Sequence, residues 1–217
     1  MCRGARILTY TCALVILAAL TAAVSCHGGG SPHCILPDGC AAEDGDIVLR
    51  RGTGLTSHAV AYADGGSDYS HCGIAVVRDG RVMVVHAVPD EPDFEGDVDR
   101  VKMEPIESFF SSIRASKGCI LRCVDRRVAA GSARKALEIY RRGVLFDHDY
   151  DISDTTKMYC SELVELAYST HGISPAEGRR HNMRFPGMKL KNVILPSDYL
   201  KSHHLHMVAH FQDGISF

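Results

Sequence analysis

Residues 71–88 read HCGIAVVRDGRVMVVHAV, and this stretch decides which fold the chain adopts. Two apolar runs, His71–Val77 and Arg81–Val88, flank the dipeptide Asp79-Gly80. An Asp-Gly dipeptide between two such runs is a strong short-range signal for a β-hairpin with a two-residue turn. The sequence therefore predicts two antiparallel strands in the core of the domain.

The register of this hairpin brings two histidines to one side of the sheet. A two-residue loop pairs Arg78 with Arg81, and counting outward makes His71 and His86 diagonal neighbours, about 7–8 Å apart at the backbone. Gly73 has no side chain and leaves space beside His86. One imidazole can then hold the other in a chosen tautomer. The alternative is two half-buried histidines, each hydrogen-bonded to the backbone.

A second informative stretch, residues 159–171, reads YCSELVELAYSTH. Cys160 shares a helical face with apolar residues such as Leu163 and Val164, so we expect it on the buried face of the first turn. Unpaired N–H groups and the helix dipole lower the pKa of a thiol there. The alternative is a small core residue, as most buried cysteines are. If the helix packs on the sheet face that carries His71, the two residues supply a thiol nucleophile and its base.

The remaining pattern predicts a small α+β domain with an antiparallel sheet packed against helices. The 217 residues suffice for one domain with a sizeable core. We expect further strands at 45–50, 118–124 and 203–211, helices at 55–63, 105–113 and 132–142, and an acidic loop at 90–99.

The order of these motifs resembles the YiiX/YebB-like cysteine hydrolases, which are circularly permuted members of the NlpC-type papain-like superfamily. The resemblance covers residues 43–200, with histidine first and cysteine last, whereas ordinary members have cysteine first. It implies a circularly permuted papain-like fold. The motifs that carry it are Gly45-Asp46 before a strand, Tyr69–Ile74, Val85–Val88, and residues 146–154 leading to Tyr159–Val164.

The resemblance also implies roles for three residues. Cys160 would be the nucleophile, His71 the general base, and His86 the polar residue that orients His71. Related sequences often carry glutamate in the position of His86. A neutral histidine stabilises an imidazolium less than a carboxylate does, so we expect weaker activity or a shifted pH range. We also expect Tyr69, Tyr159 and Asp46 to line the cleft, although ordinary packing explains the tyrosines equally well.

These roles define a reaction. The thiolate of Cys160 attacks an amide or ester carbonyl, and His71 passes the thiol proton to the leaving group. Water then cleaves the thioester with His71 as base. Backbone N–H groups at the start of the helix, including that of Cys160, are the natural oxyanion donors. We expect no cofactor.

The first 25 residues have the pattern of a bacterial lipoprotein signal. Arg3 and Arg6 precede an uncharged apolar run, and small residues then lead to Cys26. Cys26 would be lipidated and become the mature N-terminus, with residues 26–43 as a tether and 44–217 as the hydrolase domain. The alternatives are an ordinary cleaved signal, which gives a secreted or periplasmic protein, and a retained helix. All three place the domain outside the cytoplasm.

Other cysteines and charged clusters give weaker signals. Cys34 and Cys40 flank a turn, and a local disulfide fits an oxidising compartment. Cys72 points away from the face of His71, and we interpret it as packing. Residues 147–151 alternate carboxylates like a calcium loop but lack its glycine and glutamate. The histidines at 203–210 fit a solvated surface better than a metal site, so we expect no metal.

Together these features predict an extracytoplasmic cysteine hydrolase that cleaves amide bonds. The expected substrate is a cell-wall peptide or peptidoglycan fragment, and the first alternative is a lipid or N-acyl amide. A binding module that kept the fold without turnover is the second alternative. The expected membrane contact is through the lipid anchor. The net charge of −2 and the scattered basic pairs argue against nucleic acid as a partner.

Overall fold

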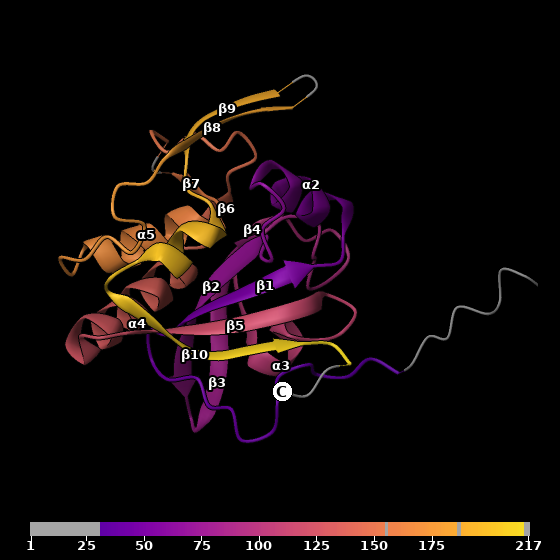
Figure 1. The fold of residues 1–217 in the computed structure, drawn as a ribbon, viewed down its shortest axis with the longest axis vertical. Helices are drawn as coiled ribbons and strands as arrows, with labels where there is room; N and C mark the ends of the chain where they lie inside the picture. The colour runs from indigo at the N-terminus through magenta and orange to yellow at the C-terminus, as the bar shows by residue number, and fades with distance from the viewer. Residues whose placement is uncertain (1–30, 155, 186–187, 215–217) are drawn as a thin grey trace, which may run out of the picture. The chain divides into compact units, whose positions relative to one another are not determined.

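The computed structural model describes residues 31–154, 156–185 and 188–214. The expected signal segment and the lipidation candidate Cys26 lie outside the described residues. One compact unit spans His33–Phe217, and Figure 1 shows its sheet and helices. In the described part of the chain, the longest apolar helices fall short of the length and hydropathy needed to cross a membrane.

An eight-stranded sheet forms the centre of this unit, in the order β10-β5-β1-β2-β3-β4-β6-β7. Neighbouring strands run antiparallel except for β6 and β7, which are parallel. A separate hairpin of β8 and β9 lies near α2 (Figure 1). The described strands are β1 Ile47–Gly52, β2 His71–Arg78, β3 Arg81–Val88, β4 Arg100–Pro105, β5 Ala115–Cys123, β6 Leu145–Phe146, β7 Lys157–Met158, β8 His181–Phe185, β9 Met188–Val193 and β10 Leu205–Gln212.

The central hairpin has the predicted register. Val77 pairs with Val82 and Arg78 pairs with Arg81. The turn residues Asp79 and Gly80 have φ angles of 50° and 76°, and a type I′ turn requires positive φ at both positions. The prediction of the hairpin is therefore confirmed, and with it the placement of His71 and His86 on one face.

The described helices are α2 Leu55–Ala63, α3 Ile106–Phe109, α4 Arg126–Arg141, α5 Cys160–Ser169 and the 3₁₀ helix η1 Pro196–Lys201. Helix α4 begins six residues before the expected helix because the Asp125 side chain accepts hydrogen bonds from the N–H groups of Arg127 and Val128. The expected helix at 105–113 is wrong in extent. Strand β4 ends at Pro105, and α3 is a single turn.

The two faces of the sheet pack against different elements. The face of Cys72 and Ile74 packs against α4 and α5 in the larger core, which includes Leu163 and Val164. The opposite face packs against α3 in a second core that contains Phe109, Ala75 and Val84. Because side chains alternate along β2, His71 belongs to the second face. Helix α5 therefore packs on the face opposite to that of His71.

The C-terminal part of the expected tether 26–43 packs against the domain. Ile35 and Ala42 are buried in the second core, and the N–H of Ile35 donates to the carbonyl of Phe110 at 2.9 Å. The Glu43 carboxylate pairs with Arg122 at 2.7 Å. The segment 33–43 is thus an integral part of the folded domain.

Candidate active site

Cys160 is the first residue of α5. Tyr159 caps the helix in an extended conformation, which leaves the first-turn N–H groups directed toward the region of the thiol. The residues on either side of Cys160 are anchored. The hydroxyl of Tyr159 accepts from the N–H of Ile194 at 3.0 Å, and the hydroxyl of Tyr199 donates to the carbonyl of Ser161 at 2.7 Å. The C-terminal segment therefore fixes the position of the thiol.

His71 lies against this thiol, although α5 packs on the other face of β2. His71 is the first residue of β2, so its ring meets the start of α5 at the end of the strand. The charge and the ring of His71 lower the pKa of Cys160, as a neighbouring imidazole does, and both residues line one cleft. The structure therefore brings together the two residues that the sequence proposed as nucleophile and base.

The thiol of Cys72 also contacts Cys160, which corrects the interpretation of Cys72 as packing alone. A hydrogen bond from Cys72 is the largest influence that holds the pKa of Cys160 well below its ordinary value; burial opposes it, and His71 reinforces it. Burial and the neighbouring sulfur raise the pKa of Cys72 well above its usual range. Cys72 therefore keeps its proton, and Cys160 carries the thiolate.

His86 lies beside His71, where the hairpin register places it. The Nε2 atom of His71 lies 2.8 Å from Nδ1 of His86. His86 is fully buried, and burial is the main cause that lowers its pKa to about 4, so this ring is neutral near pH 7. A Cβ atom at Gly73 would lie 3.0 Å from the Cβ of His86. The glycine thus provides the space beside His86 that the sequence predicted.

Glu104 is a site residue that the sequence reasoning missed. Its Oε1 atom lies 3.0 Å from Nε2 of His86. The pKa of Glu104 is lowered to about 2: burial raises it, and His86 and two arginines lower it more strongly. The signal that could have found Glu104 is the alternation of Val101 and Met103 with polar residues before Pro105, which is typical of a strand.

Two arginines and a second glutamate surround this pair. The buried Arg50 guanidinium donates to the carbonyl of Phe109 at 3.1 Å, stacks over the Phe109 ring and pairs with Glu91. Arg114 lies 2.5 Å from Oε2 of Glu104 and 3.5 Å from Glu91. The network is electrically balanced and holds the floor of the cleft in place.

The cleft at Cys160 and His71 has a volume of about 990 Å³, which is at the upper end of the range for small-molecule sites. Its walls are mainly apolar. Helix α2 contributes Leu55 and Val60, β9 contributes Leu190 and Val193, and the end of β3 and the residue after it contribute Val88 and Pro89. Among the described residues that line it, the charged groups are Arg50, Arg114, Asp90 and Glu91, on the side of His71.

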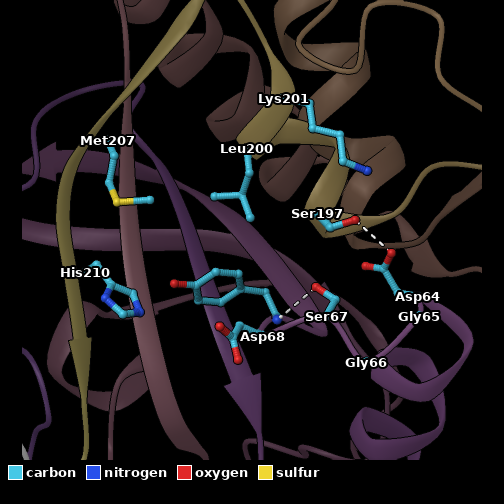
Figure 2. Close-up of a pocket in the computed structure, with 11 residues that line it drawn as sticks. Asp64, Gly65, Gly66, Ser67, Asp68, Ser197, Leu200, Lys201, Met207 and His210 are labelled. Carbon is cyan, nitrogen blue, oxygen red and sulfur yellow. Dashed lines mark hydrogen bonds between the residues drawn. The ribbon is translucent and has the colours of Figure 1, made fainter.

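The structure places the three expected cleft residues differently. Tyr159 lines the cleft of Cys160. Tyr69 instead borders a second, shallower pocket between the end of α2 and β10, whose other residues include Asp64, Lys201 and His210 (Figure 2). Asp46 is buried away from both pockets and pairs with Arg122 at 2.8 Å. Tyr69 and Asp46 are therefore structural residues, and their expected place in the cleft is wrong.

The weaker sequence signals have structural explanations. Cys34 and Cys40 are free thiols, so the expected local disulfide is absent from the structure. Asp147 accepts hydrogen bonds from the N–H groups of Asp149 and Asp151 and thereby shapes a turn. Among the described residues, no group of three or more ligating side chains is placed to hold a metal.

Comparison with known proteins decides the family. The family model of permuted papain-like amidases, YaeF/YiiX, known as C92, matches residues 41–209. The chain belongs to this family. As a C92 member it is a papain-like cysteine amidase by family, and the expectation of an enzyme rather than a binding module is confirmed.

A solved structure has the same fold. The crystal structure of the metalloprotein YiiX from Escherichia coli O157:H7 matches with a TM-score of 0.61 and 22% sequence identity, over 77% of this chain and 96% of that one. The predicted permuted papain-like α+β fold is therefore confirmed. No curated protein matches the chain.

Proposed function

We propose that this C92 amidase cleaves an amide or ester bond next to an apolar acyl or hydrocarbon group. The observation that supports this substrate class is the cleft of about 990 Å³, whose walls are mainly apolar and into which Cys160 and His71 open. Such walls stabilise a ligand by removing apolar surface from water, at roughly 25 cal/mol per Å². The lipid or N-acyl amide alternative thus gains support over a cell-wall peptide, which would bring many polar groups into the cleft.

The mechanism follows from the contacts around Cys160. The thiolate, stabilised by Cys72 and His71, attacks the carbonyl carbon and forms a tetrahedral intermediate. The N–H groups of the first turn of α5 stabilise its oxyanion. The imidazolium of His71 protonates the leaving group, and the acyl group remains on sulfur as a thioester. His71 then takes a proton from water, which attacks the thioester and regenerates Cys160.

The proposed location is extracytoplasmic, with Cys26 as the lipidated residue. The support is the basic start, the apolar run and the small residues before Cys26. An anchored enzyme would meet substrates at the membrane surface, which suits a ligand with a hydrocarbon chain.

A substrate panel tests the proposed activity. Purified protein is incubated with N-acyl amino acids of increasing chain length and with muropeptides, and a Cys160→Ala variant serves as the control. We expect the wild type to release free acid from the acyl series, with kcat/KM rising with chain length, and the variant to be inactive. Turnover of muropeptides alone would contradict the apolar substrate class and favour the cell-wall peptide. An acyl series that the variant hydrolyses equally well would contradict the role of Cys160.

A further inference from the structure

The buried carboxylate of Glu104 stands behind His86 in the same sheet face. Val84 pairs with Glu104, and His86 pairs with Lys102, so Glu104 and His86 are diagonal neighbours on one face. Glu104 Oε1 lies 3.0 Å from His86 Nε2, and neither atom has a well-aligned hydrogen-bond partner within the described residues. Hydrogen bonds of this kind are often poorly aligned before substrate binds.

We propose that Glu104 is a positioning residue that acts through His86, so that Cys160, His71, His86 and Glu104 form one relay. Glu104 fixes the tautomer of His86, and His86 in turn fixes the orientation and the charge of His71. The role of Glu104 rests on the proposed function in one respect, because it needs Cys160 and His71 to act as nucleophile and base.

The tautomers follow from which atoms are able to donate. An ionised carboxylate only accepts hydrogen bonds, so Nε2 of His86 carries the hydrogen that faces Glu104. In a neutral ring the other nitrogen, Nδ1, is then an acceptor. Nδ1 of His86 lies 2.8 Å from Nε2 of His71, so His71 donates there. The remaining nitrogen of His71, Nδ1, is left for the proton that it exchanges with Cys160.

The relay also explains how a histidine replaces a carboxylate as the orienting residue. The imidazolium of His71 forms beside the thiolate of Cys160, and a nearby negative charge stabilises it. His86 is neutral and supplies no such charge by itself. Glu104 supplies this negative charge from the far side of the His86 ring. Because Glu104 lies in the interior, solvent screens its charge only weakly.

Other charged groups face this relay from each neighbouring element. Arg50 of β1 and Glu91 of the loop after β3 form one ion pair, and Arg114, before β5, contacts Glu104 and Glu91. Lys102 pairs with His86 in the β3–β4 ladder, and its Nζ forms an ion pair with Oδ1 of Asp93 at 2.6 Å. Both arginines favour the ionised form of Glu104, and Arg50 disfavours a second proton on His86. An ionised Glu104 accepts the hydrogen of His86 at Nε2.

The pH dependence of Cys160 alkylation tests the role of Glu104. Iodoacetamide labelling of the Cys160 peptide is measured by mass spectrometry from pH 4 to 10, in wild type, Glu104→Gln and the matched control Glu138→Gln. Glu138 is exposed on α4 and pairs with Lys135. Without the charge of Glu104, the imidazolium is less stable. We expect thiolate formation to move up by about one pH unit in Glu104→Gln and to stay unchanged in the control.

A double variant shows whether Glu104 acts on Cys160 through His86. Glu104→Gln is repeated in a His86→Ala protein, where we expect no further shift of the labelling curve. An equal shift in that background would overturn the relay, as would a wild-type curve for folded Glu104→Gln. Since labelling needs no substrate, an inactive substrate panel together with the expected shift would contradict only the proposed substrate class.

The unmodified protein provides a test that does not depend on folding of a variant. Long-range ¹H–¹⁵N NMR spectra identify which ring nitrogen of each histidine carries hydrogen. We expect His86 to be protonated on Nε2 alone at pH 7. A spectrum with the hydrogen of His86 on Nδ1 would overturn the proposal.

Discussion

At the scale of single residues, two neighbouring residues of β2 contact the thiol of Cys160 from different sides. Cys72 and His71 are adjacent in β2 and point to opposite faces, yet both reach Cys160 because the thiol lies where the strand begins. The nucleophile therefore has a neutral donor on one side and a basic ring on the other. This arrangement favours the thiolate through two different interactions.

The contribution of Cys72 predicts an effect of removing its thiol. In Cys72→Ala, the thiolate of Cys160 loses its largest stabilising hydrogen bond, so we expect its pKa to rise by about one unit. The labelling curve of the Cys160 peptide measures this shift. Cys123→Ala, which removes another buried thiol of the same core, is the control. A curve that is unchanged in Cys72→Ala would show that His71 alone sets the pKa.

His86 predicts how stability depends on pH. In the folded protein the pKa of His86 is lowered to about 4 from 6.5. As the pH falls, His86 is therefore protonated in the unfolded chain before it is protonated in the folded protein. The free energy of unfolding should therefore decrease between pH 6.5 and 4, by on the order of 3 kcal/mol. Urea unfolding at several pH values measures it. The decrease should be smaller in His86→Gln, and an equal slope in both proteins would contradict the assignment.

At the scale of elements, the pairing of β2 with β3 holds the catalytic rings in register. Gly73 allows this because a Cβ atom there would lie 2.6 Å from a methyl group of Val84 and 2.9 Å from the carbonyl oxygen of Val85. Any side chain at this position must displace β3 and the His86 that it carries.

Gly73→Ala is therefore expected to reduce kcat/KM by at least about tenfold, since small displacements of catalytic groups have large effects on rate. The matched control is Gly118→Ala, which meets Phe211 on β10 instead. Both variants should have a lower Tm, but only Gly73→Ala should lose activity per folded molecule. Full activity of folded Gly73→Ala would show that β3 adjusts without moving His86.

The same elements show how much the sequence could predict. The hairpin was predictable because an Asp-Gly turn fixes a register, and the register placed His71 beside His86. Glu104 was missed because β4 is short and ends in Pro105, a residue typical of helix starts. The face of the sheet that α5 covers was left open by the sequence, since the side on which a helix packs depends on tertiary contacts that periodicity does not contain.

At the scale of the whole molecule, the boundary of the domain has consequences for stability. Residues 33–43 connect the second core to β5 through Ile35, Ala42 and the pair of Glu43 with Arg122. Composition alone made this segment look like a tether, because its glycine and proline residues are typical of turns. Its few apolar side chains nevertheless fill positions against Phe110.

A chain that starts at Asp44 is thus expected to be less stable than one that starts at Ser31. Burial of a side chain the size of Ile35 contributes roughly 2 kcal/mol, and the ion pair and backbone hydrogen bonds add to it. Urea unfolding of both chains at pH 7 measures the difference. Equal free energies of unfolding would restore residues 33–43 to the role of a tether.

The hydroxyl of Tyr159 accepts a hydrogen bond from Ile194, and the hydroxyl of Tyr199 donates one to Ser161, so the C-terminal segment is connected to the residues around Cys160. The same segment also forms one wall of the cleft through Ile194, Leu195 and Pro196. Mutations there would alter substrate preference and nucleophile geometry together, so adaptation by this route is constrained. Helix α2 also lines the cleft, and substitutions on it can change specificity without disturbing these two hydrogen bonds.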